Sequence, residues 1–325
     1  MNSPVQVTVT GAAGNVAYAL LFRIAAGELL GADTPVTLRL LDIEPALPAL
    51  DGVAMELADG AFPLLHDVIT TADHATAFDG TSWALLVGAT PRAQGMERGD
   101  LLAANAASFG PQGAAIAAGA ASDVRILVVG NPCNTNCFIA RRHAPEIPDE
   151  RWFAMTRLDE NRAKAMLAAK SGTPVAQVTN TAIWGNHSAT QFPDAYHARI
   201  GGRLAPEVIA DESWLREAFI ADVQNRGAAI IAARKHSSAA SAAHAIIDSV
   251  RSVHHPTAAG DWNSMAVVSH GEYDVPEGLI FSYPVRSDGD RLVVVEGIEH
   301  DENAQARLLA TTEELIRERD ISRDF

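Results

Sequence analysis

Long apolar runs and cysteines are scarce in this 325-residue sequence. No apolar run approaches the roughly 18 residues that a membrane-spanning helix needs, and the segment before the first expected strand lacks the basic and apolar regions of a signal peptide. The two cysteines, Cys133 and Cys137, are four positions apart, which is neither the redox nor the zinc spacing of C-x-x-C. Free thiols without a secretion signal are typical of a reducing compartment, so we expect a cytoplasmic protein that does not contact membranes.

Positive charge is also in short supply. The formal net charge is −15, which disfavours a nucleic-acid partner because phosphates need a basic surface. An anionic substrate would have to be bound by individual cations rather than by the overall field. These would be arginines, because lysine occurs only at positions 164, 170 and 235. The planar fork of arginine suits carboxylates and phosphates.

The first half of the chain alternates short apolar runs with helical patterns. The runs are "VQVTV", "VTLRLLD", "DVITT", "WALLVGA" and "VRILVVGN". Continuous Val, Leu and Ile runs separated by helices indicate a parallel sheet covered on both faces.

After about residue 155 the pattern changes. A helix is expected to end at Gly172, with a proline two positions on, and a broken helical stretch to run from Ser213 to Val253. The segment "SDGDRLVVVEG" indicates a hairpin with Asp288-Gly289 as its turn. We therefore predict an α/β protein with a doubly wound Rossmann-type domain at 1–155 and an α+β substrate domain at 156–325.

The first strand enters a glycine-rich turn, "VTVTGAAGNVAYAL", with Gly11, Gly14 and Ala17 in register. Small residues let the backbone approach a pyrophosphate, and the following helix N-terminus offers free N–H groups. The spacing differs from G-x-G-x-x-G, so the turn alone is a weak signal. Asp42, at the end of the second strand, strengthens it, because an acid there accepts ribose hydroxyls and repels the 2′-phosphate of NADP. Asp42 as a simple helix cap is the alternative.

Short-chain reductases also begin with a turn of this kind, but they need a tyrosine with a lysine four residues later. The residues four positions after the tyrosines of this chain are Phe22, Ile200, Glu277 and Ser287. That class of enzyme is therefore excluded.

Three further segments carry charged or titratable side chains suited to a site. Arg92 and Arg98 lie in a glycine-containing loop after a strand, where they could bind an anion or be solvated surface residues. Asp159 and Arg162 share one face of an expected helix, and they either form a salt bridge or point toward an imidazole and a carboxylate respectively. His187 follows a strand in "IWGNHSATQFPD", and its surroundings alone do not show whether it transfers protons.

Several ordered motifs together resemble malate dehydrogenase, in the branch of the lactate/malate dehydrogenase family that includes cytosolic eukaryotic and many bacterial enzymes. They are "GAAGNVAYALL", "LLDIEPALPALDGVAMEL", "VGATPRAQGMERGDLLAAN", "VVGNPCNTNC", "TRLDENRAKA", "IWGNHSATQFPD" and "RGAAIIAARKHSSAASAAHAIID". The match extends to about residue 250, and the last ~75 residues agree only in general pattern.

The resemblance implies a role for each candidate substrate residue. His187 would be the acid/base and Asp159 its partner, while Arg162 would bind the C1 carboxylate of the substrate. Arg92 would hold the distal carboxylate, where lactate dehydrogenases have an uncharged residue. The resemblance also implies that Arg98 polarises the reacting carbonyl and that Asn131, before a cis Pro132, contacts substrate and cofactor.

The cofactor implied is NAD, and no metal is expected. The residues expected to bind NAD are Gly11, Ala12, Ala13, Gly14, Asn15, Val16, Ala17, Asp42, Asn105, Gln112, Val129, Gly130, Asn131 and, lining the nicotinamide end, Ser241. Adjacent His254 and His255 diverge on any regular element, so we interpret them as surface residues rather than metal ligands.

The resulting hypothesis is a homodimeric enzyme of the tricarboxylic acid cycle that reversibly oxidises (S)-malate to oxaloacetate. Two alternatives remain: a related 2-hydroxy-acid dehydrogenase, and a non-catalytic module that senses NAD.

Overall fold

A computed structural model describes residues 3–91, 95–323 and 325. The chain divides into two compact units. Unit 1 comprises residues 1–154, 239–250 and 318–325, and unit 2 comprises residues 155–238 and 251–317. Two later segments thus pack with the N-terminal unit, so the packing units are discontinuous along the chain. No described helix is long and apolar enough to cross a membrane.

Unit 1 contains a parallel sheet of six strands in the order β3-β2-β1-β4-β5-β6. This is the strand order of a dinucleotide-binding fold, and it confirms the predicted doubly wound domain. The strands are β1 (Val5–Thr10), β2 (Val36–Leu41), β3 (Leu65–Thr71), β4 (Trp83–Leu86), β5 (Arg125–Val128) and β6 (Trp152–Ala154). Strands β4 and β5 are almost wholly buried, which explains why "WALL" and "ILV" are continuous apolar runs.

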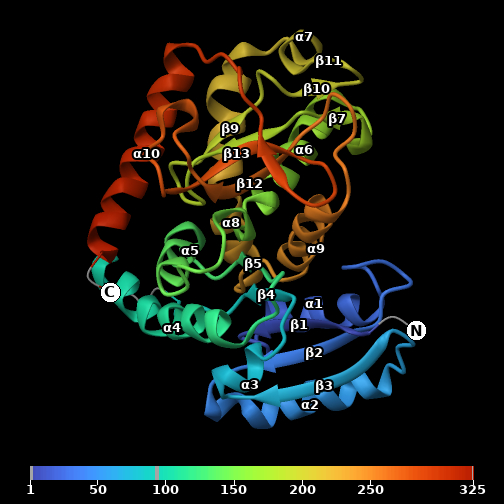
Figure 1. Cartoon of the computed structure of the whole chain (residues 1–325). Coiled ribbons are helices and arrows are strands. Elements are labelled where there is room, and N and C mark those ends of the chain that lie inside the picture. Colours follow the sequence, from blue (N-terminus) through green and yellow to red (C-terminus); the bar gives the residue numbers. More distant parts are fainter. Residues whose placement is uncertain (1–2, 92–94, 324) are drawn as a thin grey trace. The chain divides into compact units, whose positions relative to one another are not determined.

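The helices of unit 1 pack in two groups (Figure 1). Helix α1 (Asn15–Ala25) contacts α2 (Leu47–Asp59), while α3 (His74–Phe78), α4 (Arg98–Gly119) and α5 (Cys133–Arg142) contact one another in series. Short 3-10 turns lie at Glu44–Ala46 and Asp149–Arg151. The part of α9 (Ala240–His254) up to residue 250 also belongs to this unit.

The strands of unit 2 pair with one another in three antiparallel groups. Their orders are β14-β13-β12, β11-β10-β7 and β8-β9. The strands are β7 (Val178–Thr179), β8 (Ala182–Trp184), β9 (Phe192–Asp194), β10 (Arg199–Ile200), β11 (Arg203–Leu204), β12 (Asn263–Val268), β13 (Ile280–Ser287) and β14 (Leu292–Val294). The predicted hairpin at Asp288-Gly289 is confirmed between β13 and β14.

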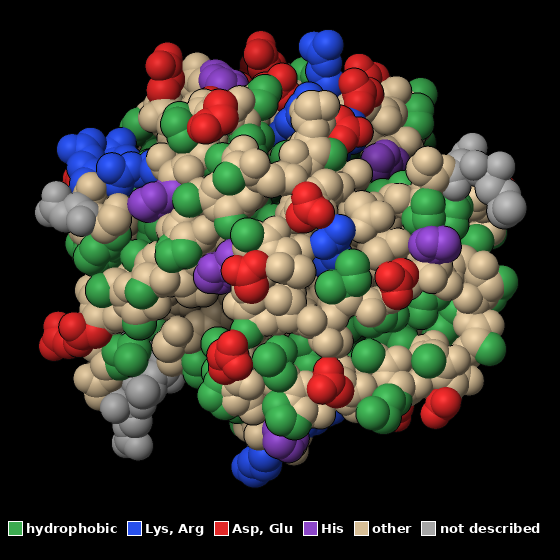
Figure 2. Space-filling model, turned by 60° about the horizontal axis from the view of Figure 1, so that its bottom comes forward, with side chains coloured by type: hydrophobic (Ala, Val, Ile, Leu, Met, Phe, Trp, Pro, Cys, Tyr) green, Lys and Arg blue, Asp and Glu red, His purple; other side chains and the backbone are tan. Residues whose placement is uncertain are grey.

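Helices complete unit 2, which confirms the predicted mixture of helices and antiparallel strands. They are α6 (Arg157–Ser171), α7 (Ala205–Ile209), a π-helix (Trp214–Ala218), α8 (Phe219–Arg234) and most of α10 (Glu302–Ser322), with 3-10 turns at Val175–Gln177 and Glu272–Asp274. Helix α6 ends as the sequence predicts, because Gly172 adopts φ +69° and Pro174 follows. On the face of the molecule displayed in Figure 2, acidic side chains are dispersed among apolar and neutral ones.

Candidate active site

His187 lies in unit 2, two residues after Gly185, a position that accepts no side chain. Gly185 follows β8 with φ +90°, and a Cβ added there would lie 2.2 Å from the Thr311 side chain. Its backbone N–H and C=O both pair with Ser282 of β13 at 3.0 Å. The end of β8 is therefore fixed on both sides, and the chain turns there to present His187.

The Asp159 carboxylate holds this histidine. Asp159 lies in the first turn of α6 and is fully buried. One of its oxygens, Oδ2, is hydrogen-bonded to His187 Nδ1, and the other, Oδ1, accepts from Arg162 Nη1 at 2.8 Å. The salt bridge and the imidazole contact that the sequence left as alternatives are both present, because a carboxylate has two oxygens.

This arrangement changes the protonation of His187. Burial lowers the pKa of the imidazole, but the charge and hydrogen bond of Asp159 outweigh burial and raise the pKa above its usual value, against a smaller opposing effect of Arg162. With Nδ1 engaged by Asp159, Nε2 is the nitrogen suited to exchange a proton with a substrate. The pair has the geometry of a general acid/base.

Arg162 provides a fixed positive charge beside the pair. Its side chain is 12% exposed. Nη2 has a long contact of 3.4 Å with Ser238 Oγ, and the buried Nε has no hydrogen-bond partner among the described residues. A buried donor without an acceptor is costly, so an anionic ligand that accepts from this guanidinium would satisfy it. A carboxylate fits this requirement.

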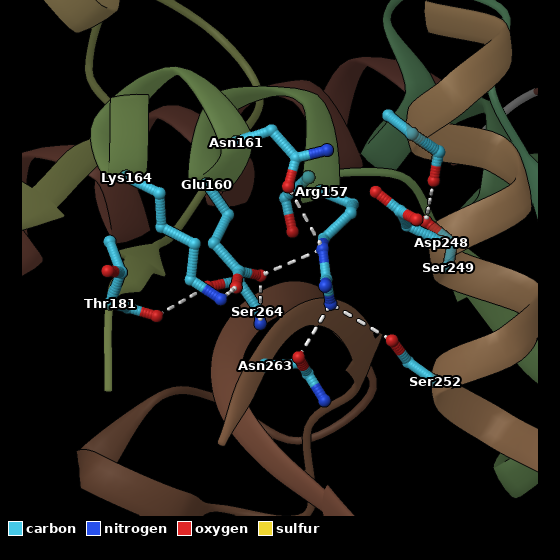
Figure 3. Close-up of polar contacts among 12 residues, drawn as sticks. Arg157, Glu160, Asn161, Lys164, Thr181, Asp248, Ser249, Ser252, Asn263 and Ser264 are labelled. Carbon is cyan, nitrogen blue, oxygen red and sulfur yellow. Dashed lines mark hydrogen bonds and ion pairs between the residues drawn. The ribbon is translucent and has the colours of Figure 1, made fainter. Parts of the chain in front are cut away.

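An adjoining face of α6 anchors the helix. Glu160 is fully buried, and its carboxylate pairs with Lys164 at 2.9 Å and Arg157 at 3.6 Å and accepts the backbone N–H of Ser264 at 2.7 Å. Arg157 also donates to Asn263 Oδ1 at 2.6 Å and to Ser252 Oγ at 2.9 Å (Figure 3). These contacts tie α6 to β12, and successive helical residues point about 100° apart. One face of α6 thus carries Asp159 and Arg162 while the adjoining face fixes the helix.

In unit 1, the glycine turn has the close backbone approach expected of a pyrophosphate site. Gly11 has φ +61°, and an added Cβ would lie 2.4 Å from Gly88 Cα. Helix α1 begins four residues later with no acidic side chain in its first turn, so its N-terminus remains electropositive. Asp42 accepts the backbone N–H of Ala13 at 2.9 Å and that of Ile43 at 2.8 Å. A carboxylate has further acceptor positions for ribose hydroxyls, so these residues fit NAD.

The remaining residues of the turn, and those after β5, are placed as follows. Ala12 and Ala17 are fully buried, Ala13 and Val16 are partly buried, and Asn15 is exposed. Val129 and Gly130 are buried directly after β5, where the Gly130 carbonyl accepts from Asn136 Nδ2 at 2.9 Å. Asn131 is exposed, and its bond to Pro132 is cis, as the resemblance implies.

The two residues of α4 that are predicted to bind the cofactor are both buried. Asn105 bonds to both backbone groups of Thr90 and to the Leu101 carbonyl at 2.9–3.2 Å, so its amide is engaged within the protein. Gln112 donates to Ser108 at 2.9 Å, whereas its buried Oε1 has no hydrogen-bond partner among the described residues. That orphaned acceptor is compatible with a donor on a bound cofactor.

Comparison with known proteins identifies the family. Residues 5–153 match the NAD binding domain of lactate/malate dehydrogenase, and residues 156–324 match its alpha/beta C-terminal domain. The chain belongs to the lactate/malate dehydrogenase family. It is therefore an NAD-dependent oxidoreductase.

Solved structures of this family match over nearly the whole length. Malate dehydrogenase from Naegleria fowleri is 46% identical, with a TM-score of 0.96 and coverage of 100% of this chain and 99% of that one. Trichomonas vaginalis lactate dehydrogenase, solved with NADH and oxamate, is 34% identical, with a TM-score of 0.94 and 98% coverage of each chain. Malate dehydrogenase from Salinibacter ruber, at 21% identity and a TM-score of 0.82 with 98% coverage of each chain, shares the fold.

The resemblance to the lactate/malate dehydrogenase family implies three other site residues, and the structure describes two of them. Arg98 is the first residue of α4, and its Nη2 donates to Glu318. Ser241 is exposed on the unit 1 part of α9. Arg92 lies outside the described residues.

Sequence reasoning missed two acidic residues on α10, one of which contacts a candidate residue and the other the sequence neighbours of His187. Glu318, buried in unit 1, binds Arg98 and accepts from the Thr135 hydroxyl. Glu314, in unit 2, contacts both sequence neighbours of His187. Their four-residue spacing places them on one helix face, but the sequence gives no sign of what that face meets. Within residues 3–91, 95–323 and 325, no group of three metal-ligating side chains comes together.

Proposed function

We propose that the chain catalyses the reversible NAD-dependent oxidation of (S)-malate to oxaloacetate. The observation that carries this proposal is the Asp159–His187 pair beside the Arg162 guanidinium, because together they provide a proton acceptor and an anion-binding group. The 46% identity to a malate dehydrogenase supports the choice of substrate. The proposal places the enzyme in the cytoplasm and in the tricarboxylic acid cycle.

In this mechanism Arg162 binds the C1 carboxylate and fixes the hydroxyl-bearing carbon. His187 Nε2 accepts the hydroxyl proton, and Asp159 stabilises the resulting imidazolium. NAD supplies the hydride acceptor when bound. In the reverse direction His187 must be protonated, so a raised pKa favours oxaloacetate reduction over a wider range of pH.

We assign the cofactor to the sequence range 1–155 and the acid/base to 156–325. Gly11 to Ala17, Asp42, Asn105, Gln112, Val129 to Asn131 and Ser241 would contact or support NAD. Arg98 and Asn131 would contact the substrate. The contacts of Asn105 with Thr90 favour a supporting role for this residue.

From the sequence, we assign discrimination between malate and lactate to Arg92. Its guanidinium would pair with the second carboxylate of oxaloacetate, whereas the methyl group of pyruvate would leave it unpaired. The competing function is reduction of pyruvate, which the 34% identity to a lactate dehydrogenase favours.

Following NADH absorbance with oxaloacetate, pyruvate and a branched 2-keto acid separates these functions. We expect kcat/KM to be highest for oxaloacetate. A preference for pyruvate would contradict the dicarboxylate assignment, and NADH binding without turnover of any keto acid would favour the sensor. In Arg92→Gln we expect oxaloacetate to lose far more kcat/KM than pyruvate.

We further propose a homodimer. In unit 1, Tyr18 on α1 and Met55 on α2 are 43% and 67% exposed, and Tyr18 packs edge to face on Phe22 at 5.1 Å. Exposed apolar side chains on two packed helices suit burial against a second copy. Light scattering of the wild type and Met55→Glu tests this, and a monomeric wild type would contradict it.

A further inference from the structure

The loop that carries His187 is held by one carboxylate oxygen from α10. Glu314 Oε2 accepts from Asn186 Nδ2 at 3.0 Å and from the Ser188 hydroxyl, and it lies 2.5 Å from Thr190 Oγ1. Two of these partners are the residues on either side of His187. A single acceptor therefore restrains the backbone both before and after the histidine.

Thr311, three residues earlier on α10, adds to this restraint. It is fully buried, its Oγ1 accepts the backbone N–H of Asn186 at 2.9 Å, and it lies 3.0 Å from Thr190 Oγ1. Its side chain also occupies the space that a Cβ at Gly185 would need. Positions i and i+3 share one face of a helix, so Thr311 and Glu314 present a continuous acceptor surface to residues 185–190.

We propose that Glu314 is a positioning residue that sets the orientation of the His187 imidazole against Asp159, an inference that rests on the proposed function of the site. Glu314 contacts Asn186 and Ser188, the residues on either side of His187, and acts through them. A carboxylate suits the task because it only accepts hydrogen bonds and all its partners here are donors. Charge-assisted hydrogen bonds are also about twice as strong as neutral ones.

Positioning matters here because proton transfer depends on sub-ångström geometry. A displacement of about 1 Å can cost roughly 100-fold in rate. Among the described residues, Asp159 and Arg162 from α6 are charged groups that face His187, and the first of these raises its pKa while the second lowers it. A loosened loop weakens the contact with Asp159, and the pKa of His187 then returns toward its ordinary value of about 6.5.

The test compares Glu314→Ala, Glu314→Gln and the matched control Glu313→Ala. Glu313 is the adjacent glutamate; it is exposed and pairs with Arg317. In Glu314→Ala we expect kcat for malate oxidation to fall about 10–100-fold and the pH midpoint of kcat to move to lower pH. Affinity for NADH, measured by fluorescence, should change less than about twofold. Glu314→Gln, which keeps one acceptor oxygen, should recover most of kcat and of the midpoint, and Glu313→Ala should match the wild type.

Histidine NMR titration of the same variants gives a readout that does not depend on turnover, with the His187 signal assigned from His187→Gln. An unchanged His187 midpoint in Glu314→Ala would overturn the inference, as would a loss of kcat only in proportion to the fraction that binds NADH. If Glu314→Ala does not fold, Ser188→Ala removes one donor from the loop side and should move the midpoint in the same direction. If the wild type fails to turn over any keto acid, the proposed function is wrong, and the NMR titration still decides the role of Glu314.

Discussion

Asp159 and Glu160 are consecutive acidic residues, and both side chains are fully buried. Asp159 pairs with a titratable histidine and with an arginine whose Nε has no hydrogen-bond partner among the described residues. Glu160 pairs with Arg157 and Lys164 and accepts a backbone N–H. Equal burial therefore does not imply equal roles, because a partner that can change its charge permits chemistry, whereas permanent cations only fix the helix.

The largest expected effect comes from Asp159→Asn. An amide cannot stabilise the imidazolium, so we expect kcat for malate oxidation to fall by roughly 10²–10⁴-fold, the usual contribution of acid–base catalysis. Stopped-flow or steady-state NADH absorbance measures kcat, and NADH fluorescence verifies that the variant still binds cofactor. A variant with wild-type kcat would refute the role of the pair.

In Glu160→Gln we expect the opposite result from Asp159→Asn: a large decrease in the free energy of unfolding and a small change in kcat. Removing one partner of a buried ion pair leaves uncompensated charge and costs about 3–5 kcal/mol. Urea unfolding followed by circular dichroism measures the free energy of unfolding. We expect kcat per folded molecule to stay within about threefold of the wild type, and a loss as large as that of Asp159→Asn would erase the distinction between the two acids.

Lys164→Gln sharpens the comparison, because Glu160 keeps its contacts with Arg157 and Ser264. We expect a loss of about 1.5–3 kcal/mol in the free energy of unfolding, the range for hydrogen bonds to charged groups. Lys170→Gln is the matched control on the same helix, since Lys170 is 33% exposed and pairs with an exposed Asp211. Equal decreases in the free energy of unfolding of the two variants would show that burial of the Glu160 cluster adds nothing to stability.

The smallest expected effect is the pH dependence of the free energy of unfolding in variants of the two acid clusters. The pKa of His187 is raised in the folded protein, so its pairing with Asp159 stabilises fully below about pH 6.5 and this contribution is lost as the pH rises through the folded pKa. The stability cost of His187→Gln should therefore be smaller at about pH 9 than at about pH 6. The cost of Glu160→Gln should be the same at both, because arginine and lysine side chains keep their charge over this range. Urea titrations at the two pH values test this, and a parallel change in both variants would contradict it.

The fold of the first half is predictable from the sequence because five of its six parallel strands coincide with short runs rich in Val, Leu and Ile, whereas the three-residue β6 gives no such signal. The second half is harder, since β7, β10 and β11 have only two residues each and cannot show a period. The long helical stretch predicted between Ser213 and Val253 is broken as expected, at Lys235 with φ +63°, but its π-helical start has no signal in the sequence.

The sequence predicts those site residues that belong to local motifs, and it misses those that depend on contacts between distant segments. Four of the candidate residues lie in short sequence motifs that can be recognised from neighbouring residues or from a recurrent spacing. They are Gly11, Asp42, Asp159 and His187. Glu314 and Glu318 escape detection because the residues they contact are more than a hundred positions away. The choice between a salt bridge and a histidine contact for Asp159 also could not be made from spacing, since both exist.

The Thr311 side chain occupies the space that a side chain at position 185 would need, so it fits only because residue 185 is glycine. A chimaera that took residues up to 185 from a relative with a larger side chain there would collide with this threonine, however well each parent folds. Segments of this enzyme exchanged with those of its relatives must therefore carry both positions together.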